Sequence, residues 1–199
     1  MEALESVTQL CFDLSVAPEE AYRSFPVESA LQVLVQALTR PFPEISNYSV
    51  IAINHILDCV PNSGLVFAGV GGVNRICEKL LNFEYIDTAE HIVKTLDHLA
   101  KDQAILILRE GAFTTIVNMI DFFEYSLQKK ILATATNIVK HVYREDLVVE
   151  YVFPVIPTIA NHLAYKGEEL LELSELSLEF FLALAENLNR LMITQNELF

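Results

Sequence analysis

The sequence predicts an all-α protein, a right-handed α-solenoid built from armadillo/HEAT-like three-helix repeats. Apolar residues recur every three or four positions in residues 27–38 and again in residues 86–99, which is the spacing of one buried helix face. Six glycines and seven prolines divide the chain into stretches of about 10 to 18 residues, a usual length for globular helices. No stretch alternates apolar and polar residues over the length of a strand, so we expect helices throughout.

The helical stretches follow a repeating order of a short, a medium and a long helix. The first apolar residues of the medium helices, Val27, Val73, Phe113 and Val155, follow one another at intervals of 46, 40 and 42 residues. A period of about 40 to 47 residues is typical of armadillo and HEAT solenoids. A glycine stands just before two of these medium helices, in the sequences GGV and EGAF, where it allows a sharp turn between helices.

We expect the elements in the following places along the chain. The short helical segments are residues 18–25, 61–69, 101–110 and 144–152. The medium helices are residues 25–38, 70–81, 110–123 and 152–163. The long helices are residues 47–60, 84–100, 124–140 and 169–188. One helix of each kind makes up a repeat.

We treat the whole chain, residues 1–199, as one armadillo-like solenoid. Residues 1–17 would be the trailing helix of a preceding repeat, and residues 189–199 the start of a further repeat. The full repeats are then residues 18–60, 61–101, 102–142 and 143–188. Both ends are apolar, with Phe12 near one and Met192 near the other, whereas a solenoid requires polar capping repeats. Fraying of the ends is the alternative, but we expect the chain to be a fragment of a longer protein.

The composition excludes several classes of function. The chain has a formal net charge of −14 and is 52% hydrophobic, which is too apolar for a disordered chain. The shortage of Lys and Arg argues against nucleic acids and anionic membrane surfaces, because both are bound through cationic side chains. The most apolar stretch, residues 147–165, is interrupted by Pro154 and Pro157, so we do not interpret it as a membrane span. We therefore expect no nucleic acid and no membrane among the partners.

The cysteines indicate a reducing compartment. Cys11, Cys59 and Cys77 are an odd number and have no C-x-x-C spacing, so neither a disulfide framework nor a zinc knuckle is expected. The N-terminus lacks the basic and apolar regions of a signal peptide. We expect a cytoplasmic and/or nuclear protein.

No motif for catalysis or metal binding is visible in the sequence. His91 and His98 share a helix face, but no H-E-x-x-H sequence and no Cys/His cluster accompanies them. Residues 69–72 contain three glycines, yet a dinucleotide-binding turn would require a further glycine at Asn74 and a preceding strand. We predict no catalytic residue, no metal site, no cofactor and no small-molecule ligand.

One repeated position along the long helices carries side chains that form hydrogen bonds. It is occupied by His55, His98, Asn137 and Asn187. Equivalent positions of stacked repeats line up, so this set would suit an extended peptide, whose backbone amides need partners at regular intervals. To this candidate partner-binding set we add the neighbouring Asn54, Lys94 and Lys140. The alternative is that these side chains bond helix carbonyls between repeats.

The last long helix carries an acidic stripe. Glu172, Glu175 and Glu179 follow one another at spacings of three and four residues, which places them on one side of the helix. Glu168 and Glu186 extend the stripe. A basic partner would relieve the repulsion between these like charges, so we include Glu172, Glu175 and Glu179 among the candidate partner-binding residues. The alternative is a solvated face that keeps the solenoid soluble.

Three stretches in the same order resemble a known family. They are RSFPVESALQVLVQAL, LLNFEYIDTAEHIVKTLDHLAK and REGAFTTIVNMIDFFEYSLQKKILATATNIVK. Together they resemble the N-terminal armadillo-like region of HECT-type E3 ubiquitin ligases of the ubiquitin-fusion-degradation subfamily, which has close analogues of EYIDTAEHIVKTL and of the DFF triplet at residues 121–123. The similarity runs over nearly the whole chain and is strongest over residues 25–139. The chain departs from the family at Gln128-Lys129, where Gln-Arg is usual.

This resemblance implies a non-catalytic substrate- or ubiquitin-recognition region of a HECT-type E3 ubiquitin ligase that acts in ubiquitin-dependent protein degradation. In that family a C-terminal HECT domain carries the catalytic cysteine, and no stretch of this chain resembles it. The implied partners are protein substrates bearing degrons and/or ubiquitin chains. The alternative function is a stand-alone armadillo scaffold or adaptor that binds peptides or protein partners.

Overall fold

A computed structural model describes residues 2–22, 24–82, 86–164 and 171–196. Helices, together with a few short 3-10 and π turns, are the regular elements of these residues, and none of these residues lies in a β-strand. The all-α fold predicted from the hydrophobic spacing is thereby confirmed. Contacts divide the chain into two compact units, Met1–Gln103 (unit 1) and Ala104–Phe199 (unit 2).

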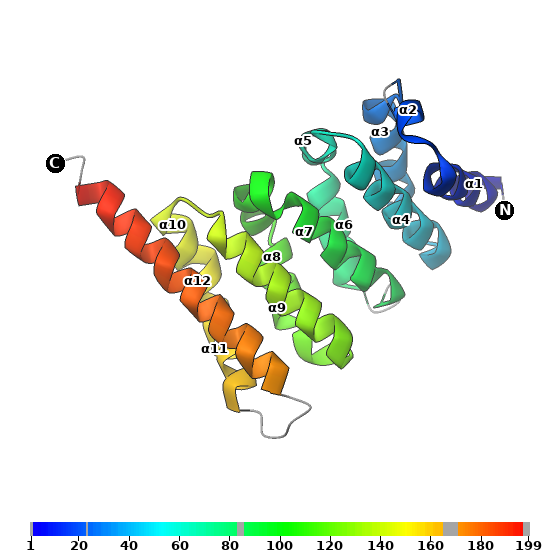
Figure 1. Ribbon diagram of the computed structural model, residues 1–199. Helices are drawn as coiled ribbons and strands as arrows, with labels where there is room; N and C mark the ends of the chain where they lie inside the picture. The colour runs from blue at the N-terminus through cyan, green and yellow to red at the C-terminus, as the bar shows by residue number, and fades with distance from the viewer. Residues whose placement is uncertain (1, 23, 83–85, 165–170, 197–199) are drawn as a thin grey trace. The chain divides into compact units, whose positions relative to one another are not determined.

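Helix α4 packs against several of the other helices of unit 1. The helices are α1 (Glu2–Val16), α2 (Glu19–Tyr22), α3 (Val27–Ala37), α4 (Pro43–Cys59), α5 (Ser63–Gly69), α6 (Gly72–Leu80) and most of α7 (Ile86–Arg109). Helix α4 packs against α1 and α3, and side-chain hydrogen bonds tie it to α7 (Figure 1). The helical course of α7 is broken at Gln103, the last residue of unit 1, whose φ of −127° and ψ of 19° are not helical.

The residues whose spacing predicted helices form the core of unit 1. Leu31 and Leu34 of α3, Ile53 of α4 and Ile92 and Leu96 of α7 are all fully buried. Burial of one such side chain stabilises a fold by about 1.5 to 3 kcal/mol, so these apolar stripes are the main source of stability.

Two glycines form the corners predicted between short and medium helices. Gly71, directly before α6, and Gly111, directly before α8 (Ala112–Asn118), both have a φ of 77°. A residue with a Cβ is strained in this left-handed region, whereas glycine is not. These glycines belong to the GGV and EGAF sequences, and they permit the chain reversal at which the medium helices begin.

Unit 2 is built around two long helices that lie side by side. They are α9 (Tyr125–Lys140) and α12 (Leu171–Asn196), and Figure 1 shows α12 running along α9. The shorter elements are α8, η2 (Ile120–Phe122), α10 (Glu145–Leu147), η3 (Val148–Val152), η4 (Phe153–Val155), α11 (Ile156–Asn161) and η5 (His162–Ala164). Phe113 and Ile116 of α8 and Phe180 of α12 are fully buried, so both long and short elements contribute to the core of this unit.

The stretch Glu145–Ala164 in unit 2 is long and apolar enough to cross a membrane by length and composition alone, with a mean hydropathy of 1.4. Core helices of soluble proteins pass the same test. The stretch is divided into short helical pieces around Pro154 and Pro157, and Val152 and Ile159 are fully buried within the unit. In this structure it forms the short and medium elements expected before the last long helix.

The end of α12 differs from the boundary expected at residue 189. The same helix continues to Asn196, because residues 189–196 contain neither glycine nor proline to break it. The boundary expected at residue 189 therefore lies inside α12. That residues 189–199 start a further repeat stays a prediction, and residues 197–199 lie outside the described residues. The repeats 18–60, 61–101, 102–142 and 143–188 stay predictions, since contacts define two units rather than four repeats.

Candidate functional site

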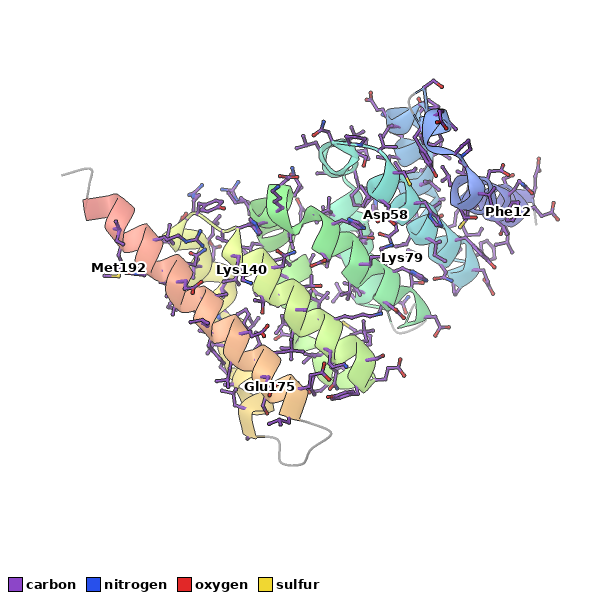
Figure 2. The ribbon with its side chains drawn as sticks, viewed as in Figure 1. Phe12, Asp58, Lys79, Lys140, Glu175 and Met192 are labelled. Atoms are coloured by element: carbon purple, nitrogen blue, oxygen red, sulfur yellow. The ribbon has the colours of Figure 1, made fainter. Side chains whose placement is uncertain are left out.

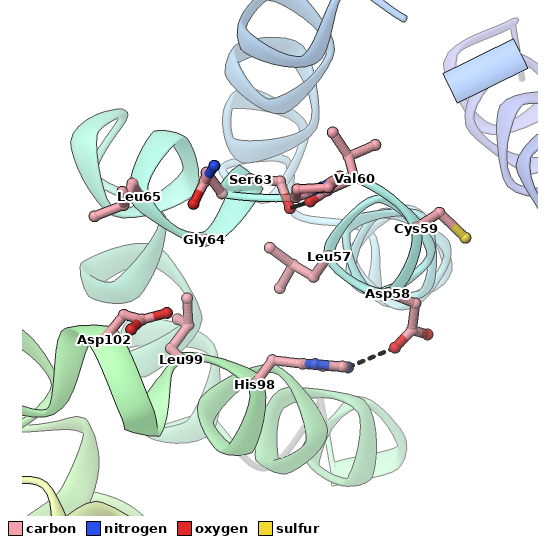
Figure 3. Close-up of a pocket in the computed structure, with 12 residues that line it drawn as sticks. Leu57, Asp58, Cys59, Val60, Ser63, Gly64, Leu65, His98, Leu99 and Asp102 are labelled. Atoms are coloured by element: carbon pink, nitrogen blue, oxygen red, sulfur yellow. Dashed lines mark hydrogen bonds and ion pairs between the residues drawn. The ribbon is translucent and has the colours of Figure 1, made fainter. Parts of the chain in front are cut away.

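Two of the predicted partner-binding residues, Lys94 and His98, are held by a carboxylate that the sequence analysis missed. Asp58, near the end of α4, lies with its Oδ2 2.8 Å from Lys94 Nζ and its Oδ1 2.7 Å from His98 Nε2. Figure 2 labels Asp58, and Figure 3 marks its contact with His98. Asp58 follows His55 by three residues and so lies on the same side of α4, which is the signal that could have found it. Lys94 and His98 are therefore part of a bridge between α4 and α7.

Asn54 is an internal brace of unit 1. Its side chain is buried, with only 3% of the residue exposed. The amide nitrogen donates to the carbonyl of His91 at 2.9 Å, and Oδ1 accepts from the hydroxyl of Thr95 at 2.9 Å. Both partners lie on α7, so Asn54 forms the carbonyl-bonding arrangement that was the alternative to partner binding.

Asn187 has the same role in unit 2. It is 1% exposed, and its amide nitrogen donates to the carbonyls of Val139 at 2.7 Å and Val142 at 2.6 Å. Val139 lies in the last turn of α9, and Val142 lies two residues beyond its end, where a helix leaves carbonyls without N–H partners in the next turn. Arg190, one turn later on α12, donates to the carbonyl of Lys140 at 3.1 Å. Side chains of α12 thus cap α9.

The remaining polar residues of the predicted set lie nearer the surface. His55 is half-buried on α4, and its ring makes no hydrogen bond or ion pair within the described part of the chain. Asn137 is half-buried on α9, and its carbonyl is 2.8 Å from Nδ1 of His141. Lys140 is exposed at the end of α9 (Figure 2), and its ammonium has no ion pair among the described residues. His55 and Lys140 therefore stay accessible.

Glu172, the first described residue of the acidic stripe, is bound to α9. Its Oε2 lies 2.9 Å from Lys129 Nζ and accepts a hydrogen bond of 3.3 Å from the hydroxyl of Tyr125. The hydrogen bond from Lys129 lowers the pKa of Glu172 and, in return, raises the pKa of Lys129. Lys129 also lies over the ring of Tyr125, 5.0 Å from its centroid. Glu172 thus belongs to a contact between α9 and α12.

The other described glutamates of the acidic stripe have no cationic side chain bound to them in the described part of the chain. Glu175, Glu179 and Glu186 are exposed and have no ion pair in the part of the chain that the structure describes; Glu175 is labelled in Figure 2. Leu182, which is 61% exposed, stands three residues after Glu179 and four before Glu186. Glu168 lies outside the described residues. The outer face of α12 therefore combines negative charge with exposed apolar surface.

A cavity of about 230 Å³ opens in unit 1 where α4 ends (Figure 3). It is lined by Leu57, Asp58, Cys59, Val60, Pro61, Asn62, Ser63, Gly64, Leu65, His98, Leu99 and Asp102. The lining includes two carboxylates, those of Asp58 and Asp102, and no Lys or Arg. The sequence does not predict this cavity, because it forms only where the end of α4 and the start of α5 lie against α7, which comes later in the chain.

The thiols differ in their exposure. Cys11 and Cys77 are buried, and Cys59 is exposed at the edge of the cavity. Burial raises the pKa of the Cys11 thiol, which makes it a weaker nucleophile at neutral pH. Within the described residues, His, Cys, Asp and Glu side chains form no group of three that could hold a metal ion.

A family model described as "E3 ubiquitin-protein ligase TRIP12-like, TPR repeats" matches residues 1–109, more than half of the chain. The chain belongs to the TRIP12-like family. The resemblance to the N-terminal armadillo-like region of HECT-type ligases of the ubiquitin-fusion-degradation subfamily is thereby confirmed.

Relatives of this TRIP12-like chain come from plants, animals and fungi. E3 ubiquitin-protein ligase UPL3 of Arabidopsis thaliana is 31% identical over 88% of this chain and 9% of its own length. E3 ubiquitin-protein ligase TRIP12 of Danio rerio is 24% identical over 86% of this chain and 8% of its own length. Ubiquitin fusion degradation protein 4 of Saccharomyces cerevisiae is 21% identical over 79% of this chain and 11% of its own length. The chain thus spans about a tenth of the length of these curated relatives.

Solved structures with similar folds include armadillo repeat proteins. The armadillo repeats only protein of Plasmodium falciparum has a TM-score of 0.72 at 15% identity, over 91% of this chain and 79% of that one. A computationally designed armadillo repeat protein for modular peptide recognition has a TM-score of 0.69 at 17% identity, over 92% of this chain and 80% of that one. At these identities the likeness concerns the fold alone, and the armadillo-type repeat fold of this TRIP12-like chain is confirmed.

Proposed function

We propose that this chain is a non-catalytic protein-recognition region of an E3 ubiquitin ligase that acts in ubiquitin-dependent protein degradation. The observation that carries the proposal is the family match over residues 1–109, which concerns repeats and not the part of a ligase that transfers ubiquitin. The curated relatives match this chain over about a tenth of their length, in the same N-terminal region. A repeat region of this kind contributes surface for partners rather than reacting groups.

The partners we propose are protein substrates that bear degrons and/or ubiquitin chains. Support comes from side chains that internal contacts leave accessible: His55 in unit 1, and Lys140, Glu175 and Glu179 in unit 2. Each unit offers its own polar surface, and scattered charges and hydrogen-bonding groups give specificity more than affinity. One relative is named as a ubiquitin fusion degradation protein, which supports fused or attached ubiquitin as part of the recognised substrate.

Direct titration tests this function. The purified chain is labelled with a fluorophore and titrated with ubiquitin, linked ubiquitin chains, a ubiquitin-fusion substrate and an unrelated protein of similar size. We expect saturable binding to at least one of the ubiquitin-bearing proteins and none to the unrelated protein. A matched control carries Lys140→Glu together with Glu175→Lys. This double variant keeps the net charge of the chain and reverses the sign of the charge at each of the two positions in unit 2.

A second assay separates recognition from catalysis. The chain is incubated with ubiquitin, activating enzyme, conjugating enzyme and ATP, and the products are resolved without reductant. We expect no thioester on Cys11, Cys59 or Cys77, because two of these thiols are buried. The third, Cys59, shares its cavity with the imidazole of His98, but Nε2 of that ring lies 2.7 Å from Asp58 Oδ1 and so is engaged by a carboxylate. A reducible ubiquitin adduct on the chain would contradict the proposal.

A further inference from the structure

We infer that the cavity at the end of α4 binds one basic side chain, lysine or arginine, of a peptide segment in a partner protein. That the bound side chain belongs to a partner protein rests on the proposed function. The shape and lining of the cavity do not depend on that function. Three walls define the site: the last turn of α4, the beginning of α5 and the second half of α7 up to Asp102 (Figure 3). All three belong to unit 1.

The size of the cavity suits a side chain. Sites for metabolites and drug-sized molecules usually enclose about 300 to 1,000 Å³. At about 230 Å³ this cavity falls below that range. It is large enough for one extended side chain, and it opens at the surface, so the remainder of a peptide lies outside it.

The apolar part of the wall suits an aliphatic stem. Leu57, Leu65 and Leu99 line the cavity from α4, α5 and α7. Leu65 is 56% exposed although it is a leucine, so contact with a partner would remove apolar surface from water. Lysine and arginine bury their methylene groups on such surfaces while the charged end stays near polar partners.

The polar part of the wall suits a positive charge. Asp102 lies one turn after His98 on α7 and has no ion pair in the described part of the chain. Asp58 contributes a second carboxylate, already shared with Lys94 and His98. An incoming ammonium or guanidinium would find Asp102 unpaired, and charge-assisted hydrogen bonds of this kind are among the stronger polar contacts. An anionic ligand would meet two carboxylates and no Lys or Arg from the lining.

The net charge of the whole chain also favours a cationic partner. A net charge of −14 attracts a cationic segment over distance and raises the rate at which it meets the surface. This general attraction would not by itself place a side chain in the cavity. The experiment must therefore distinguish the contribution of the cavity to binding from that of the overall charge.

The test measures binding of a fluorescent octapeptide of alternating lysine and arginine to the intact chain, with an all-glutamine octapeptide as the neutral control. The decisive variant is Asp102→Asn, which keeps the shape of the side chain and removes one charge. Its matched control is Glu44→Gln, which removes the same charge at the other end of α4, about 20 Å from Asp58 along the helix. Circular dichroism and thermal melting establish that both variants are folded.

We expect the basic peptide to bind the parent chain, Asp102→Asn to weaken binding about tenfold, and Glu44→Gln to change it by less than about twofold. A second variant, Leu65→Lys, places the chain's own ammonium at the cavity, and we expect it to abolish binding without unfolding an exposed position. In amide NMR spectra of the parent, the signals of Ser63 and Gly64 shift on addition of the peptide.

The inference would be overturned by no binding of the basic peptide to the parent, by equal weakening in Asp102→Asn and Glu44→Gln, or by full binding to Leu65→Lys. Loss of binding in Glu175→Gln with Glu179→Gln, while Asp102→Asn binds normally, would move the site to α12 and equally overturn it. The titration with ubiquitin-bearing proteins is a separate readout. If that titration succeeds and the basic peptide fails, the recognition function stands without this cavity.

Discussion

Asn54 on α4 and Thr95 on α7 are joined by a hydrogen bond of 2.9 Å inside unit 1. Both residues are buried, and the same asparagine donates to the carbonyl of His91. A neutral amide held in this way locks two long helices in register, because a slip of either helix would leave buried polar groups without partners.

The first prediction concerns this amide. Asn54→Ala should lower the free energy of unfolding by about 2 kcal/mol, since it leaves the His91 carbonyl and the Thr95 hydroxyl with fewer partners in a buried place. Urea titration followed by circular dichroism measures the change. His55→Ala is the neighbouring control and should cost less than about 0.5 kcal/mol, because the His55 ring makes no hydrogen bond in the described residues. Equal costs for the two variants would contradict the bracing role.

Asn187 gives a second stability prediction, in unit 2. Asn187→Ala removes two buried hydrogen bonds to the end of α9 and should cost about 2 to 3 kcal/mol. Amide hydrogen exchange shows which helices lose stability. Protection should fall in α9 and α12, and the helices of unit 1 should keep theirs. An unchanged exchange pattern in α9 would show that the carbonyls of Val139 and Val142 find water instead.

The bridge from Asp58 to Lys94 and His98 should matter less than the buried amides. All three side chains are about a third to a half exposed, at 35%, 51% and 32%, so water screens their attraction. Asp58→Asn should cost less than about 1 kcal/mol, and the cost should shrink when salt is raised. Denaturant unfolding at low and high salt tests this. A large cost that is independent of salt would mean that Asp58 acts through packing.

The contact of Glu172 with Lys129 predicts a local titration. The hydrogen bond from Lys129 holds the pKa of Glu172 below its ordinary value, so the pair stabilises the fold above the unfolded pKa of the glutamate and loses this contribution as pH falls through the folded pKa. In Lys129→Met the NMR titration midpoint of the Glu172 carboxyl carbon should rise toward the ordinary glutamate value. An unchanged midpoint for Glu172 in Lys129→Met would contradict the contact.

Local chemistry explains which parts of the fold were predictable. The spacing of apolar residues around Leu31 and Ile92 predicts the helices, and the glycines at positions 71 and 111 predict the turns. Both features depend only on residues that are close together along the chain. No helix end appears at the boundary expected at residue 189, because no helix-breaking residue stands there and α12 continues to Asn196.

The candidate site was less predictable, for a physical reason. The sequence indicated that Asn187 occupies a repeated position, but whether its amide faces a partner or a helix carbonyl depends on packing between α9 and α12. Asp58 was missed because its partners lie on another helix, and the cavity beside it has walls from three. Long-range contacts of this kind leave no local pattern in the chain.

Competition in a complete ubiquitination reaction tests the recognition function most directly. A full-length TRIP12-like ligase, its activating and conjugating enzymes and a ubiquitin-fusion substrate are combined with increasing amounts of this chain. We expect substrate ubiquitination to fall as the chain occupies the substrate, while the ligase forms its ubiquitin thioester at an unchanged rate. Undiminished substrate ubiquitination at saturating chain, with the chain still folded, would contradict the recognition role and favour a stand-alone scaffold.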